Sequence, residues 1–231
     1  MIMKSQLRSL VAATAMSFVM SVAGAEPPQR ASKPSPTDIE LLMPLDTTGS
    51  DVQETSYGNV FADAARASGG ADAAMVPADE FVPKRFERGK HSVGDLQSAL
   101  RNLNDPTDHI IVLQLTGAQL KSALSRAVSH VPLPFSGFVQ VSGMSFRFNP
   151  SLSEGKQIAS VQVAGAPLDE TRNYTVATTR PMANGSFGYF RNWDDKAIKS
   201  DTGKDVGVAL AEYLSTRRSV NVMADGRIAK L

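Results

Sequence analysis

Cysteine is absent from the 231 residues of this chain. Its absence rules out disulfide bonds, thiolate metal sites, a cysteine nucleophile and a lipid anchor carried on cysteine. A strong excess of one charge is absent as well. The chain has 24 basic and 23 acidic residues. Two of the basic ones, Lys4 and Arg8, belong to the N-terminal segment described next, and without them the net charge is 22 − 23 = −1. A chain balanced in this way has no general attraction to nucleic acid or acidic membranes, so we expect no nucleic-acid partner.

The N-terminal segment has the pattern of a secretory signal peptide. Lys4 and Arg8 precede a run of apolar and small residues from Leu10 to Val22, and Ala23-Gly24-Ala25 follows. A basic start, a short apolar stretch and an A-x-A ending favour a signal peptide over a buried N-terminal helix. We therefore predict a signal peptide over 1–25, cleavage after Ala25, and a periplasmic or secreted mature protein. No later apolar run is long enough to span a membrane, which takes ~20 residues, so no span is expected.

The mature chain divides into a leader and one domain. Residues 26–38 contain four prolines and almost no large apolar side chain, which is typical of a disordered leader. From residue 39 onward the periodicity predicts a single domain to residue 231. Helices are expected over 56–68, from Ser92 to about 103, after Thr116, and over 205–214. Strands are expected over 39–45, 71–76, 109–115, 138–141, 144–148, 158–163, 174–179 and near 228.

The order of these elements indicates the fold class. Strands and helices are interspersed without a regular βαβ repeat, which favours an α+β domain with a mixed β-sheet packed by helices. The strand over 109–115 alternates poorly, so we expect both of its faces to be covered.

Five segments, taken in order, resemble one known family. Glu54–Ala64 resembles the motif E-x-x-x-G-N-x-x-A-D-A, and Leu113–Lys121 resembles V-E-L-T-G-A-Q-L-K. The others are Phe138–Gly143, which resembles F-L-Q-V-S-G, Tyr174–Thr178 with Ala183–Gly185, which resemble Y-x-V-A-T followed by A-N-G-G-D-G-Y, and Gly226–Ile228, which resembles G-R-I. The mature chain from residue 39 is thus similar to the C-terminal domain of the 5′-nucleotidase family.

The resemblance implies a division of labour. In that family of periplasmic or extracellular enzymes, an N-terminal domain with two metal ions hydrolyses nucleotides and related esters, and the C-terminal domain holds the nucleoside. Two-metal hydrolysis needs many Asp, His and Asn ligands. The three histidines here, His91, His109 and His130, lie in none of the family's metal motifs. We therefore expect that the family's catalytic domain is absent from this chain. We expect no catalytic residue, no metal site and no other cofactor.

The family's substrate-holding positions also differ in this sequence. Its N-G-G-x-I-R loop corresponds to Pro77–Val82, which has no Asn, Gly pair or Arg. The family's first base-stacking Phe corresponds to the segment Asn104–Pro106 here, and its second stacking aromatic corresponds to Pro181-Met182. The acid of its G-G-D-G motif is replaced by Phe187. A nucleoside site of the family's kind is not expected. Two adjacent acid pairs, Asp79-Glu80 and Asp194-Asp195, are poor candidates for acid–base work because neighbouring side chains point apart.

Two clusters are candidate ligand-binding segments. A basic run contains Lys84, Arg85 and Arg88, and could bind a phosphate or an acidic partner, or could simply be a solvated loop. An aromatic run beside Asn184 could form a stacking platform or pack in the core; its members are Phe187, Tyr189, Phe190 and Trp193. The sharper hypothesis is that 81–91 and 182–193 face each other across one cleft, which requires an accessible Trp193 and an Arg85 on the same side of the domain.

Three functions remain open on the sequence alone. The first is a non-catalytic module that binds a small anionic or nucleotide-like ligand, or docks on a separate metallophosphatase. The second is a hydrolase, or a hydrolase subunit acting with such a partner. The third is a structural protein of the cell envelope, with the proline-rich leader as a tether.

Overall fold

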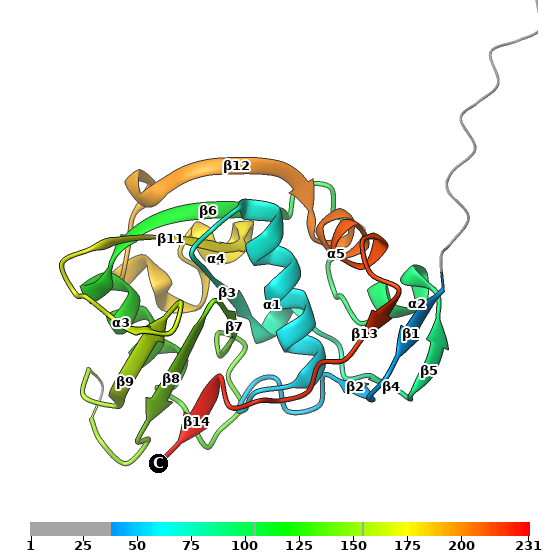
Figure 1. Cartoon of the computed structure of the whole chain (residues 1–231). Helices are drawn as coiled ribbons and strands as arrows, with labels where there is room; N and C mark the ends of the chain where they lie inside the picture. The colour runs from blue at the N-terminus through cyan, green and yellow to red at the C-terminus, as the bar shows by residue number, and fades with distance from the viewer. Residues whose placement is uncertain (1–37, 104, 154) are drawn as a thin grey trace, which may run out of the picture. The chain divides into compact units, whose positions relative to one another are not determined.

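The computed structural model describes residues 38–103, 105–153 and 155–231. The predicted signal peptide and all but the last residue of the predicted leader lie outside these ranges. A five-stranded sheet forms the centre of the fold (Figure 1). β3 and β11 run parallel, and the other neighbours are antiparallel. In spatial order the strands are β12 (Ile198–Asp205), β6 (His109–Thr116), β11 (Asn173–Thr179), β3 (Ala73–Pro77) and β7 (Val139–Ser142).

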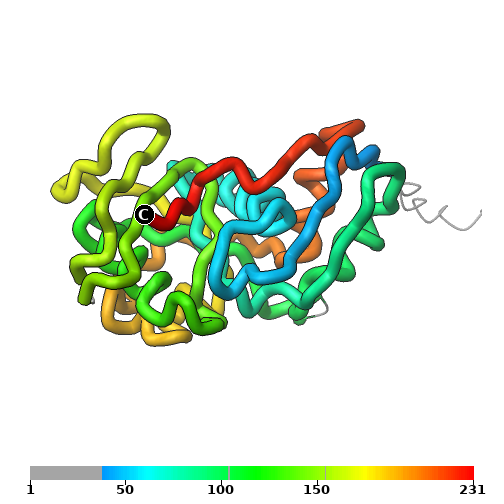
Figure 2. The backbone as a smooth tube through the Cα atoms, turned by 90° about the horizontal axis from the view of Figure 1, so that it is seen from below, coloured from blue at the N-terminus to red at the C-terminus, as the bar shows by residue number. Residues whose placement is uncertain are grey.

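Three smaller sheets surround the central one. The largest joins β10 (Ala166–Pro167), β9 (Ile158–Val163), β8 (Met144–Phe148) and β14 (Ile228–Lys230). A second joins β13 (Ser219–Val220), β1 (Ile39–Leu41) and β5 (Gly89–His91), and a third pairs β2 (Leu45–Asp46) with β4 (Arg85–Phe86). Figure 2 shows that the C-terminal segment runs back across the domain to β8, where β14 pairs in parallel. The mixed sheets and packed helices confirm the α+β class.

The helices begin where side-chain caps are available. Thr55 accepts a hydrogen bond from the Gly58 amide at the start of α1 (Ser56–Gly69), and Asp205 accepts one from the Val208 amide at the start of α5 (Val206–Ser215). Capping boxes begin α2 (Val93–Gln97) and α3 (Gly117–Ala127), as their Ser and Thr caps predict. A short α4 (Arg180–Ala183) and the 3₁₀ turns η1 (Ala78–Glu80), η2 (Ser186–Arg191) and η3 (Asp195–Ala197) complete the set. No helix within the described ranges is long and apolar enough to cross a membrane.

Both faces of the central sheet are covered by hydrophobic cores. Along β6, Ile111 and Leu113 face one core, while Ile110 and Val112 face the other, as the period-two geometry of a strand requires. The first core lies under α3, α4, η2 and the β8–β9 sheet, and the second under α1, α2 and α5 (Figure 1). The prediction that the strand over 109–115 is buried on both faces is confirmed.

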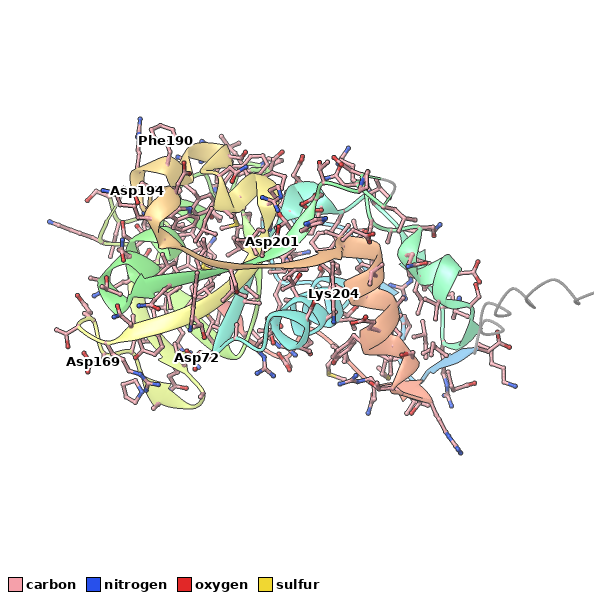
Figure 3. All side chains as sticks on the ribbon, turned by 90° about the horizontal axis from the view of Figure 1, so that it is seen from above. Asp72, Asp169, Phe190, Asp194, Asp201 and Lys204 are labelled. Atoms are coloured by element: carbon pink, nitrogen blue, oxygen red, sulfur yellow. The ribbon has the colours of Figure 1, made fainter. Side chains whose placement is uncertain are left out.

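Two predicted elements differ in extent, and one strand was not predicted. The stretch 39–45 forms two short strands in separate sheets. α2 ends at Gln97 rather than near 103, because the chain then forms turns around Leu100, which makes an isolated bridge with Phe81. β12 was not predicted. It is an edge strand in which half of the residues are exposed and none is buried, so it lacks the apolar alternation that marks a half-buried strand. Figure 3 shows it crossing the view, with Asp201 and Lys204 on it.

Candidate functional site

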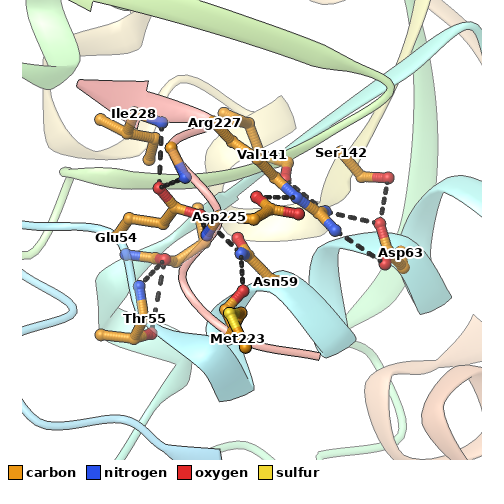
Figure 4. Close-up of polar contacts among 12 residues, drawn as sticks. Glu54, Thr55, Asn59, Asp63, Val141, Ser142, Met223, Asp225, Arg227 and Ile228 are labelled. Carbon is orange, nitrogen blue, oxygen red and sulfur yellow. Dashed lines mark hydrogen bonds and ion pairs between the residues drawn. The ribbon is translucent and has the colours of Figure 1, made fainter. Parts of the chain in front are cut away.

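The first family segment anchors the C-terminal end of the chain (Figure 4). The Glu54 carboxylate accepts hydrogen bonds from Asn59 Nδ2 at 2.6 Å and from the backbone amides of Asp225, Gly226 and Ile228 at 2.9, 3.0 and 3.2 Å. Burial alone would raise the pKa of Glu54. The hydrogen bonds from Asn59 and the Asp225 and Ile228 amides outweigh it and lower the pKa below its ordinary value. Glu54 is therefore a structural carboxylate, committed to holding this segment.

A second carboxylate of the same motif, that of Asp63, also makes structural contacts. Asp63 accepts hydrogen bonds from Arg227 Nη1 at 2.7 Å and from Nη2 at 3.2 Å, and both side chains are 18% exposed. Such a bidentate pair fixes the geometry of both partners. The Ser142 hydroxyl donates to Asp63 Oδ1, the oxygen that also accepts from Arg227 Nη1. The residues that carry the family resemblance at Glu54, Asp63 and Arg227 thus connect α1 to β7 and to the segment before β14, and hold the scaffold together.

The loop that follows β3, called the closed loop below, folds toward the interior, and a small cavity of about 130 Å³ lies beside Ala78, Asp79 and Phe81. Its turn η1 places Glu80 in the interior, where 1% of the residue is exposed. Arg101 holds the loop: its backbone amide donates to Glu80 O at 2.8 Å, and its side chain donates to the carbonyls of Asp79 and Phe81. The loop therefore packs against the chain around 99–101.

Glu80 forms a buried pair with Asp108, which is 2% exposed. Burial, and next the charge of Asp108, raise the pKa of Glu80 from 4.5 to about 8, so that Glu80 is protonated at neutral pH. Asp108 also accepts from Asn102 Nδ2 at 3.1 Å and from the Arg180 amide at 3.2 Å. The two acids are far apart in sequence, and nothing in the residue pattern predicts their pairing. Their burial indicates a structural role.

The predicted basic residues lie on the surface around β4. Arg85 pairs with Asp46 at 3.1 Å and with Glu87 at 2.7 Å, and Lys84 donates to Ser98 Oγ. Arg88 is exposed. With Arg85 paired to two carboxylates and all three side chains open to solvent, this segment matches the solvated-loop alternative better than a phosphate site.

The predicted aromatic platform is mostly core. Tyr189 is fully buried and donates its hydroxyl to Gly137 O at 2.8 Å, and Trp193 is 5% exposed and donates Nε1–H to Ala183 O at 3.0 Å. The two rings stack with centroids 5.1 Å apart. Phe187 is half-buried with a left-handed φ of 59°, and Phe190 is 65% exposed on the surface (Figure 3). Asn184 is exposed and ends α4.

The hypothesis of a cleft between these two segments is wrong. Tyr189 and Trp193 belong to the core on one face of the central sheet, whereas Phe86, next to Arg85, belongs to the core on the other face. Figures 1 and 2 place β4 and η2 far apart. Polar groups on the aromatic rings find backbone carbonyls inside the domain, so packing, not ligand stacking, determines their position.

The histidines lie in three separate places. His109 contacts Asp201 at 3.1 Å, His91 contacts the Glu87 carbonyl at 2.7 Å, and His130 stacks on Phe135. Within 38–103, 105–153 and 155–231, no three His, Asp or Glu side chains are grouped so that they could hold a metal ion.

A groove of about 540 Å³ lies at the opposite end of β3 from the closed loop. Ser142 and Gly143, which line it, are at the start of β3, since Ser142 pairs with Ala74. Its charged residues are three arginines and one acid, a net charge of +2: Arg66, Arg217, Arg227 and Asp63. Sequence reasoning missed this groove because Arg66 and Arg217 lie far apart in the sequence and Arg217 belongs to no motif.

Comparison with known proteins agrees with this architecture. The family model described as 5′-nucleotidase, C-terminal domain, matches residues 36–193, so the chain belongs to this family. A 5′-nucleotidase precursor from Thermus thermophilus superposes with a TM-score of 0.74 at 24% identity, over 84% of this chain and 39% of that one. The NAD nucleotidase of Haemophilus influenzae superposes with a TM-score of 0.70 at 17% identity, over 83% of this chain and 37% of that one.

Curated relatives match at similar identity. The trifunctional nucleotide phosphoesterase protein YfkN of Bacillus subtilis is 24% identical over 78% of this chain, and a 5′-nucleotidase of Diplobatis ommata is 25% identical over 52%. The chain spans only 12% and 22% of the lengths of these two proteins. What they share with it is therefore one domain.

Proposed function

We propose that this protein is an exported, non-catalytic module of nucleotide catabolism that binds a partner or a small anionic ligand. One observation carries the proposal. The scaffold of the family's C-terminal domain is intact, whereas the loop corresponding to the family's nucleoside loop is closed on the buried pair Glu80–Asp108. The partner that best fits is a metallophosphatase domain, since the related Thermus thermophilus precursor is more than twice as long as the region it shares with this chain.

Hydrolysis by the isolated protein tests the non-catalytic part. Purified protein is assayed with AMP and UDP-glucose in the presence of Mn²⁺, Zn²⁺, Co²⁺ or Mg²⁺. We expect no turnover above a mock purification, because activation of water at a two-metal centre needs a clustered ligand set. Activity that copurifies with the protein and is lost in EDTA would support the hydrolase alternative instead.

The export part has its own test. Fractionation of cells that express the full chain, followed by N-terminal sequencing, should recover a protein outside the cytoplasm that begins at Glu26. An uncleaved protein confined to the cytoplasm would contradict export while leaving the assignment to a non-catalytic module untouched.

A further inference from the structure

The groove at the start of β3 has the features of a built anion site. Arg66, near the end of α1, lies across Gly143, where an added Cβ would come within 2.7 Å of Arg66 Cδ and 2.3 Å of the Asp72 carbonyl oxygen. Gly143 has a φ of +69°, a conformation that favours glycine. Arg66 Nε donates to Ser142 Oγ at 2.9 Å, and this hydrogen bond fixes the position of the guanidinium.

The second arginine is fixed from another element. Arg217 follows α5, and its Nη1 donates to Tyr213 O at 2.6 Å and Thr216 Oγ1 at 2.9 Å. Its guanidinium carbon lies 3.5 Å from the centroid of the Tyr213 ring, an interaction that orients the planar group. Both arginines are therefore preorganised, which lowers the conformational cost of binding a ligand.

Donors remain free on both arginines. Arg227 is neutralised by Asp63 and Asp225, whereas within the described residues neither Arg66 nor Arg217 has a carboxylate partner. Within the same residues, the two terminal nitrogens of Arg66 and the Nε and Nη2 of Arg217 donate to no protein acceptor. The one acid in the lining, Asp63, is occupied by Arg227 and the Ser142 hydroxyl.

Two neutral donors complete the lining. Ser145 on β8 and Gln162 on β9 are direct cross-strand partners, so their side chains lie on the same face of their sheet. Both line the groove. The lining thus includes two unneutralised guanidinium groups, from α1 and from the segment after α5, together with the Ser145 hydroxyl of β8 and the Gln162 amide of β9.

We propose that this groove binds a phosphate group, free or as a small phosphomonoester, between Arg66 and Arg217, with Ser145 and Gln162 as further donors. Guanidinium groups bind phosphate oxygens through paired N–H donors. The site is distinct from the closed loop after β3, which lies at the other end of that strand. The proposal does not depend on docking to a metallophosphatase, and so can fail or succeed separately from the proposed function.

Calorimetric titration of the protein with inorganic phosphate, at constant ionic strength set by chloride, tests the site. The wild-type protein should bind phosphate. Arg66→Ala and Arg217→Ala should each weaken binding by about tenfold or more, because each removes charged hydrogen bonds. Arg85→Ala is the matched control, since it removes an exposed arginine that does not line the groove, and should leave phosphate binding unchanged.

A second variant avoids dependence on the arginines' structural contacts. Gln162 is exposed on β9, so Gln162→Glu should fold normally and abolish phosphate binding by placing a like charge beside the ligand. Titration with glycerol phosphate and AMP distinguishes free phosphate from an ester, and each ester that binds should show the same loss in these variants. Absence of wild-type binding to phosphate and to both esters, or equal binding by wild type and Gln162→Glu, would overturn the proposal.

Discussion

The two ends of β3 differ in a way that reverses the expectation from the family. At its carboxyl end, where the family's nucleoside loop belongs, η1 folds inward and Glu80 is buried against Asp108. At its amino end, Gly143 leaves room for Arg66, and an open groove of about 540 Å³ with a net charge of +2 remains. A fold can therefore keep its shape while the place available to a ligand changes.

Replacing the buried indole should have the largest effect on stability. Trp193→Ala is expected to lower the free energy of unfolding by about 3–5 kcal/mol, the usual cost of removing a buried aromatic ring. Chemical denaturation measures the change. The matched control is Phe190→Ala, at a residue that is 65% exposed. This control should change stability by less than about 0.5 kcal/mol, as is usual at the surface. Equal effects would place Trp193 at the surface and reopen the aromatic-platform hypothesis.

Glu54→Gln should destabilise the protein by about 2 kcal/mol near neutral pH, because hydrogen bonds to a charged acceptor contribute about that much. The pKa of Glu54 is lowered in the folded state, so the ionised carboxylate stabilises the fold above its ordinary pKa of 4.5. That contribution is lost as the pH falls through the folded-state pKa. Unfolding curves from pH 3 to pH 7 should therefore show the wild type and variant converging at the acid end. A constant difference would contradict an ionised Glu54.

Glu80→Gln should stabilise the protein near pH 8, in contrast to Glu54→Gln. The folded-state pKa of Glu80 is about 8 and its ordinary value is 4.5. Between these two values Glu80 is ionised in the unfolded chain but protonated in the folded protein. Folding therefore requires uptake of a proton, and the wild type loses stability as the pH rises from 4.5 to about 8. The amide mimics the protonated acid, and the variant should be more stable by about 2 kcal/mol near pH 8. Near pH 4 the two proteins should be equally stable. A variant that is less stable at pH 8 would show that Glu80 is ionised.

The smallest effect is expected at the rim of the groove. Ala164 and Gly165 form the two-residue turn between β9 and β10, and both have positive φ, 51° and 79°. Alanine is strained there, whereas asparagine before glycine suits such a turn. Ala164→Asn should raise the free energy of unfolding by about 0.5–1 kcal/mol. Chemical denaturation measures the change, and a variant less stable than the wild type would contradict the strain assigned to Ala164.

Local patterns predicted most of the regular structure. The Thr116 cap located α3, and the apolar spacing over 56–68 and 205–214 located α1 and α5 to within a few residues. The five ordered segments identified the family, which the match over residues 36–193 confirms. β12 escaped prediction because none of its residues is buried, and an edge strand without a buried face has no apolar alternation. The sequence left the aromatic segment open between a platform and core packing, because composition does not reveal on which side of a sheet a ring lies, and the structure confirms packing for Tyr189 and Trp193.

What the sequence determined by itself is therefore local or motif-borne: the helix starts, the doubly covered β6, the α+β class and the departure from the family's nucleoside loop. Only the tertiary structure decided which distant side chains meet. It brought Glu80 to Asp108, Asp63 to Arg227, and Arg66 to the same groove as Arg217. The physical reason is that hydrogen bonding within helices and turns acts between near neighbours, whereas a groove or a buried pair depends on how elements pack, which no short stretch of sequence encodes.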